Sequence, residues 1–134
     1  MKSDTELIER AFELLTSETY EQVLPLIDER FEMVTTAEVA SEPDVYTGPE
    51  GVRRWWVSFL DAMEWVRLEA LSFEEVGDGR VIVDFIIHAK GKQSGIETGL
   101  PAVAIATASE GTLRRLEFFT TLALARAAAR PPSG

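Results

Sequence analysis

The stretch YTGPEGVRRWW, residues 46–56, decides the fold of this chain, because it reads as a short extended segment that turns into a helix. Gly48 can adopt an N-cap conformation, and Pro49 at the first helical position loses no hydrogen bond that the helix needs. Glu50 places a negative charge at the positive end of the helix. Apolar residues then recur at steps of three and four, at Val52, Trp55, Trp56, Phe59, Leu60 and Met63. This spacing predicts a helix with one wide apolar face, which requires a large partner surface.

The sequence on either side of this stretch predicts further helices, mostly before it, and a series of strands, mostly after it. Further helices are expected at residues 4–15, 19–27 and 122–130. Strands are expected at residues 31–35, 65–76, 80–90, 96–108 and 112–121. A polar turn is expected at residues 28–30, a surface loop at 36–44 and a hairpin turn with positive φ at 77–79. Pro101 implies a bulge, a bend or an edge position. Runs of helix followed by runs of antiparallel strand are typical of an α+β fold.

The bulk composition is that of one globular domain. The chain has 134 residues, 46% of them hydrophobic, and we expect a single domain over residues 1–130 with a short disordered tail at 131–134. A net charge of −10 disfavours nucleic acid and anionic membranes as partners. The absence of cysteine excludes disulfides and thiolate chemistry. The first residues lack an apolar signal-peptide core, and no apolar run is long enough to span a bilayer, so we expect a cytoplasmic location.

The Tyr-x-Gly-Pro-Glu-Gly motif at residues 46–51 also carries a family resemblance. It runs into an aromatic helix, after two short helices and before four long strands, and this pattern resembles the SnoaL-like branch of the nuclear transport factor 2-like superfamily over residues 7–128. The resemblance implies a cone-shaped roll, in which a strongly bent, mostly antiparallel sheet wraps over the N-terminal helices and encloses an internal pocket. That superfamily includes cyclases, isomerases, epoxide hydrolases and binding modules, so the resemblance predicts a fold and not an activity.

The two faces of the strand at residues 80–90 differ in character. Val81, Val83, Phe85 and Ile87 form a wholly apolar set, which we place inside. Ile82, Asp84, Ile86 and His88 form the outer set, which is too apolar for plain solvent contact and predicts a homodimer interface. His88 is the only histidine, so it cannot belong to a multi-histidine metal site, and we expect no metal or cofactor. It is read as an acid/base group or, more simply, as a histidine at the rim of the interface.

Two residues are candidates for catalysis. The resemblance places the side of the last strand that carries Glu117 toward the cavity, where a carboxylate in apolar surroundings could act as a general base. The alternative is a Glu117 paired with a neighbouring arginine. Tyr46 could donate a hydrogen bond at the pocket mouth, or it could be a core aromatic with its hydroxyl at the surface.

The resemblance also weighs against an enzyme. Ketosteroid isomerases carry a general-base carboxylate at the end of the first long strand, where this chain has Thr35. Polyketide cyclases carry an acid near the end of the final strand, where this chain has Thr121. A hydroxyl cannot replace a carboxylate as a base at neutral pH.

The lining expected of the pocket is mostly apolar. Ala102, Ala104 and Ala106 stand where many relatives carry bulky residues, so they should leave the pocket open. Its expected lining is Met33, Thr35, Trp55, Trp56, Phe59, Phe85, Ala104, Phe119 and Thr121. In the strand at 65–76, Val66, Leu68, Ala70 and Ser72 should share one face.

Two hypotheses of function follow from this pattern. The first is a SnoaL-like pocket protein that binds an apolar or aromatic small molecule, with cofactor-free isomerase, cyclase or hydratase activity left open. The second is a non-catalytic homodimerisation module whose cavity is filled by its own side chains. The volume of the interior separates them, because small-molecule sites are open clefts of a few hundred cubic ångströms.

Overall fold

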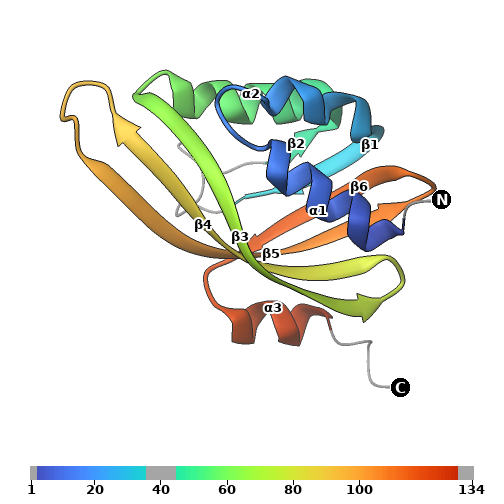
Figure 1. Ribbon diagram of the computed structural model, residues 1–134. Helices are drawn as coiled ribbons and strands as arrows, with labels where there is room; N and C mark the ends of the chain where they lie inside the picture. The colour runs from blue at the N-terminus through green and yellow to red at the C-terminus, as the bar shows by residue number, and fades with distance from the viewer. Residues whose placement is uncertain (1–2, 36–44, 130–134) are drawn as a thin grey trace.

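The computed structural model describes residues 3–35 and 45–129. The loop expected at residues 36–44 and the tail at 131–134 lie outside these residues. The elements, in chain order, are α1 (Asp4–Leu14), the 3-10 helix η1 (Tyr20–Leu26), β1 (Ile27–Val34), β2 (Val45–Thr47), α2 (Gly48–Leu60), β3 (Met63–Gly77), β4 (Arg80–Gly91), β5 (Glu97–Ser109), β6 (Thr112–Phe119) and α3 (Leu122–Ala129). Figure 1 shows a bent sheet with α1 and α2 on its concave side and α3 on its convex side.

The six strands form one sheet in the order β2-β1-β6-β5-β4-β3. Only the β1–β6 pair is parallel, and the other four pairs of neighbours are antiparallel. The expected α+β fold, with a bent and mostly antiparallel sheet wrapped over the N-terminal helices, is therefore confirmed. The sheet is not closed into a barrel, because β2 and β3 are its two edges.

Residues 46–56 form the end of β2 and the first part of α2, as expected. The N-cap is Thr47 and not Gly48, which lies one residue further on with φ +66°. Gly51 faces β2 at close range, since a Cβ built on it would lie 2.8 Å from the carbonyl carbon of Tyr46. The glycine therefore allows the helix to pack directly against the strand that precedes it.

Strand β1 begins earlier than the sequence predicts. Residues 28–30, expected as a polar turn, lie within β1. The local turn signal is real, because the backbone N–H of Arg30 donates to Oδ1 of Asp28 at 2.8 Å. Pairing of Ile27 with Leu113 nevertheless starts the strand, and the register then shifts before Glu32. The segment is thus a bulged strand in place of a turn.

A bulge also changes the predicted face of β3. The ladder between β3 and β4 is irregular between Ala70 and Ser72. Ser72 is consequently exposed, and Phe73 replaces it on the inner face, where its ring lies 6.2 Å from that of Phe12. The prediction that Ser72 shares a face with Val66, Leu68 and Ala70 was wrong because one extra residue in a strand reverses the alternation that follows it.

The turn and proline signals of the later strands are confirmed. Gly77, Asp78 and Gly79 all have positive φ in the β3–β4 turn. Pro101 pairs with Ile86 on β4, whereas β6 pairs with β5 only from Val103 onward. Pro101 therefore lies on a part of β5 with an open edge, where a missing N–H costs no ladder hydrogen bond.

Apolar side chains pack on both sides of the sheet. The larger core lies between the sheet and the helices α1, η1 and α2, and the smaller core lies between the sheet and α3. The smaller core contains Ile82, Val103, Ile105, Ala125 and Ala129. The expectation that Ile82 lies in a homodimer interface is therefore wrong, because α3 of the same chain covers it. Among the described residues, no helix has the length and apolar character needed to cross a bilayer.

Candidate functional site

The interior beneath α2 is dominated by aromatic rings from four different elements. Trp55 stacks on Phe118 of β6 at a centroid distance of 5.6 Å, and Phe59 meets Trp55 edge-on at 5.1 Å. Phe85 of β4 lies 5.9 Å from Phe118, and Phe12 of α1 lies 5.3 Å from Phe85. Offset and edge-on pairs of this kind stabilise beyond the area they bury. The rings form one continuous cluster between α1, α2 and the sheet.

The cluster leaves little free space. Beside the cluster, and sharing Phe12 with it, the described part of the chain has a void of about 20 Å³ that is lined by residues of α1, η1, β1, α2, β5 and β6. Ala104 lies opposite Phe118 across the β5–β6 ladder, so the room that the alanine leaves is occupied by the Phe118 and Trp55 rings. The space expected beside Ala104 is therefore filled, and Ala106 lines the small void.

Most of the predicted lining residues, and the predicted hydrogen-bond donor Tyr46, do lie in this interior. Those buried with the larger core, or packed against it, are Met33, Tyr46, Trp55, Trp56, Phe59, Phe85 and Ala104. Thr35 is also buried and follows directly after β1. Helix periodicity and strand alternation were sufficient to bring these side chains together.

Three predicted site residues lie on the other side of the sheet. Glu117 is half-buried there, with its Oε1 3.9 Å from Nε of Arg115. Phe119 packs against the α3 core, and Thr121 accepts a hydrogen bond from the backbone N–H of Leu124 at 3.2 Å, which caps α3. The prediction that this side of β6 faces a cavity was wrong. Leu116 and Phe118 face the larger core instead, and their apolar character was the signal that could have shown it.

The described interior carries no carboxylate and no imidazole. Among residues 3–35 and 45–129, Thr35 is the only buried residue with a polar or charged side chain apart from the aromatic Tyr and Trp residues, and no three His, Asp or Glu residues gather as a metal site would require. His88 lies on the outer face, where its Nε2 is 2.7 Å from Oε1 of Glu69 on β3. Tyr46 is buried, with the guanidinium of Arg54 4.6 Å from its ring centroid. The described interior is therefore suited to contact with neutral apolar groups.

One polar atom in this interior was not singled out by the sequence. The side chain of Trp56 is fully buried, and its indole Nε1 has no hydrogen-bond partner. Its ring stacks on Tyr20 at 5.7 Å and meets Trp55 and Phe59 edge-on at 5.7 and 6.4 Å. Periodicity places a tryptophan inside, but it carries no information on whether the N–H finds an acceptor.

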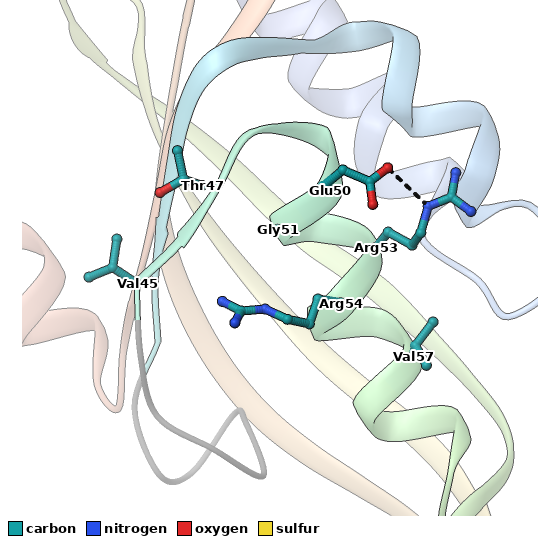
Figure 2. Close-up of a pocket in the computed structure, with 7 residues that line it drawn as sticks. All are labelled: Val45, Thr47, Glu50, Gly51, Arg53, Arg54 and Val57. Carbon is teal, nitrogen blue, oxygen red and sulfur yellow. Dashed lines mark ion pairs between the residues drawn. The ribbon is translucent and has the colours of Figure 1, made fainter.

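A separate groove of about 610 Å³ lies on the outer side of α2, beside β2. It is lined by Val45, Thr47, Glu50, Gly51, Arg53, Arg54 and Val57. Figure 2 shows Arg54 reaching from α2 toward Val45, whereas Arg53 turns away to Glu50, whose Oε1 lies 3.6 Å from its Nε. The sequence places both arginines off the apolar face but does not indicate a groove. Two of its charged side chains, Arg53 and Glu50, already pair with each other, so the groove is a secondary candidate for a ligand site.

Comparisons with known proteins give matches in structure only. No family model matches the chain, and no curated protein matches it. TerC, crystallised with polyporic acid, is 19% identical with a TM-score of 0.75, over 94% of this chain and 97% of TerC. A hypothetical protein of ketosteroid isomerase-like fold from Catenulispora acidiphila, in complex with trimethylamine, is 14% identical with a TM-score of 0.73, over 87% and 86% of the two chains. A candidate SnoaL-like polyketide cyclase from Jannaschia sp. CCS1 is 17% identical with a TM-score of 0.68, over 96% and 93%.

Proposed function

Because this chain has the nuclear transport factor 2-like, ketosteroid isomerase-like fold, we propose that it binds a small apolar or aromatic molecule between α2 and the sheet. The observation that carries the proposal is the ring cluster of Trp55, Phe59, Phe85 and Phe118, which offers flat apolar surface from three elements. Two structures of the same fold hold small organic molecules, which supports a ligand of this size. A fold of this kind does not by itself specify chemistry.

The proposal is limited to binding. Isomerisation, cyclisation or hydration without a cofactor needs a general base, which in proteins is most often a carboxylate or an imidazole. Among the described residues, the interior provides neither, and Glu117 lies on the opposite side of the sheet beside Arg115. A charged ligand would also lose its hydration without gaining a described partner of opposite charge there. The ligand class is therefore neutral and largely apolar.

Binding in this interior requires side chains to move. The rings of the cluster pack on one another with centroids 5.1–5.9 Å apart, and the void of about 20 Å³ beside them is far smaller than an aromatic ring compound. Phe59 is only half-buried at the C-terminal end of α2, so its ring can swing outward at less cost than the fully buried Trp55. We propose that the ligand takes the place of the Phe59 ring against Trp55.

A titration followed by tryptophan fluorescence and thermal melting tests this proposal. Toluene, naphthalene and a monoterpene serve as probes, and a binding probe at ten times its Kd should raise the melting temperature by roughly 3–8 °C. Phe59→Leu should change the apparent Kd several-fold, because it alters the displaced ring. Val57→Ala, in the outer groove of the same helix, should leave it unchanged. A melting temperature that no probe raises, or a response to the Val57 change alone, would refute binding in the interior.

A second candidate function is a non-catalytic homodimerisation module with a filled interior. The packing of the ring cluster favours it, because the small void is what a purely structural core would show. The contact surface would lie on the convex face beyond α3, where Ile86 and His88 are half-buried in the single chain. Ile82 no longer belongs to this surface, since α3 covers it.

Sedimentation equilibrium tests the second candidate directly. If the convex face is the interface, the wild-type chain should sediment as a dimer, and Ile86→Glu should raise the dimer dissociation constant at least tenfold by burying a charge. Val57→Glu, at an exposed apolar position on the concave-side helix α2, is the matched control and should leave the mass unchanged. A monomeric wild-type protein at all concentrations would exclude this candidate.

A further inference from the structure

The indole N–H of Trp56 is a buried donor that the fold leaves unused. Among the described residues, it is the one buried side-chain nitrogen or oxygen without a hydrogen-bond partner. Buried tryptophan N–H groups usually find an acceptor, because leaving one unpaired forfeits its hydration without compensation. An unpaired donor of this kind in an otherwise well-packed core therefore calls for an acceptor that the described residues do not provide.

The surroundings of this N–H restrict what the acceptor can be. The rings in contact with Trp56 belong to Tyr20, Trp55 and Phe59, and no Lys, Arg or His among the described residues is buried. An anionic acceptor would be desolvated there without a cation to compensate it. The stacked Tyr20 and Trp56 rings, with centroids 5.7 Å apart and planes at 22°, favour a flat partner beside them.

The same surroundings suggest how the N–H is reached. Trp56 is fully buried, whereas Tyr20 of η1 and Phe59 of α2 are both half-buried. These two rings belong to different elements, and both pack on the indole. Movement of either ring would uncover part of the indole, and the Phe59 ring is the one that the proposed function already displaces.

We propose that the Trp56 indole N–H is the hydrogen-bond donor that selects the ligand. The ligand class is a small neutral molecule with a flat apolar body and one acceptor oxygen, such as an aryl ketone or ether. The inference rests on the proposed function, because it assigns the polar contact of the same interior site. Trp56 supplies direction and selectivity, and the rings supply most of the buried contact area.

A pair of probes of equal shape separates this inference from the proposed function. Acetophenone has a carbonyl oxygen where α-methylstyrene has a methylene group, and affinities for both are measured with wild-type protein, Trp56→Phe and Trp55→Phe. Relative to wild type, Trp56→Phe should lower the ratio of ketone to hydrocarbon affinity about 2- to 12-fold, the value of one net hydrogen bond. Trp55→Phe keeps the Trp56 donor and should leave the ratio unchanged. The difference in hydration free energy between the two probes is the same for every variant, so it cancels when their affinity ratios are compared.

Each outcome of this experiment has one meaning. A ratio that Trp56→Phe leaves at the wild-type value overturns the assignment of the donor, while binding of the hydrocarbon still upholds the proposed function. Failure of both probes to bind wild-type protein refutes the function and the inference together. A fall in the ratio caused equally by Trp55→Phe shows general loss of packing and also overturns the assignment.

An NMR measurement on wild-type protein does not depend on the variants being stable. The chain has three tryptophans, so three indole N–H resonances are expected. Acetophenone should move the Trp56 resonance downfield, because a hydrogen bond deshields the proton, and α-methylstyrene should not. The resonance is assigned from its absence in Trp56→Phe or, if that variant does not fold, by elimination with Trp55→Phe and Trp65→Phe. Equal shifts with the two probes would contradict the inference.

Discussion

Replacing Trp55 with Ala should lower the free energy of unfolding by about 3–5 kcal/mol, the range of large aromatic truncations in cores. Trp55 is fully buried and contacts three other rings, those of Trp56, Phe59 and Phe118. Its removal loses the transfer free energy of the indole and leaves a cavity that the neighbouring rings on α2 and β6 cannot all move to fill. Urea denaturation followed by far-UV circular dichroism measures the change.

The matched control for this prediction is Val57→Ala on the same helix. Val57 is 48% exposed, so its truncation should change the free energy of unfolding by less than about 0.5 kcal/mol. If Trp55→Ala cost no more than the control, the ring cluster would not be the centre of the core. Such a result would also weaken the proposed ligand site, because a loosely packed Trp55 would offer no defined surface.

Replacing Gly79 with Ala should lower the free energy of unfolding by about 2–5 kcal/mol, the combined scale of backbone strain and overpacking. Gly79 has φ +72°, and a Cβ built on it would collide with the carbonyl oxygen of Ala108 on β5. The same glycine accepts a hydrogen bond from the backbone N–H of Ala108 at 2.9 Å. The alanine would therefore force the β3–β4 hairpin away from β5. Thermal melting of the variant beside wild type measures the loss.

Gly111→Ala separates the collision from the backbone strain. Gly111 has a similar φ of +79°, and nothing lies within 4 Å of the Cβ position there. Its replacement should cost only the left-handed backbone term, about 1–2 kcal/mol. Equal losses at Gly79 and Gly111 would show that contact with β5 is unimportant and that only φ matters at both turns.

Filling of the interior links stability to binding in this protein. The rings that stabilise the fold are the same rings that the proposed ligand would contact, so a ligand must compensate for the packing that it displaces. The Trp56 N–H, which is unpaired among the described residues, favours binding, because a ligand acceptor that reaches it removes the free-energy penalty of a buried donor without a hydrogen bond. This balance explains why we expect a selective ligand with an acceptor oxygen and weak binding of plain hydrocarbons.

Local signals accounted for much of the fold and for most of the interior. The period of α2 correctly placed Trp55 and Trp56 inside, and the Gly77–Gly79 turn was recognisable from its composition. Alternation in β4 correctly placed Phe85 inside and Ile86 outside. These predictions succeeded because helix period, strand alternation and positive φ are properties of a few neighbouring residues.

The predictions that failed depended on pairing between distant strands. The face of β6 that carries Glu117 was assigned from a resemblance, and the observed register places Phe118 inside instead. The bulge after Ala70 moved Ser72 out of the interior, and α3 covered Ile82 on the convex face. A bulge or a helix that docks from far along the chain reverses or hides a face without any local signal.

The sequence by itself therefore determined the class of the fold, the order of its elements and the aromatic character of its interior, because each follows from short-range periodicity. Only the tertiary structure decided which side of β6 is buried, how the rings fill the interior and that the indole N–H of Trp56 has no acceptor among the described residues. These properties depend on the summed volumes and relative positions of side chains from elements far apart in the chain. No window of neighbouring residues contains that information.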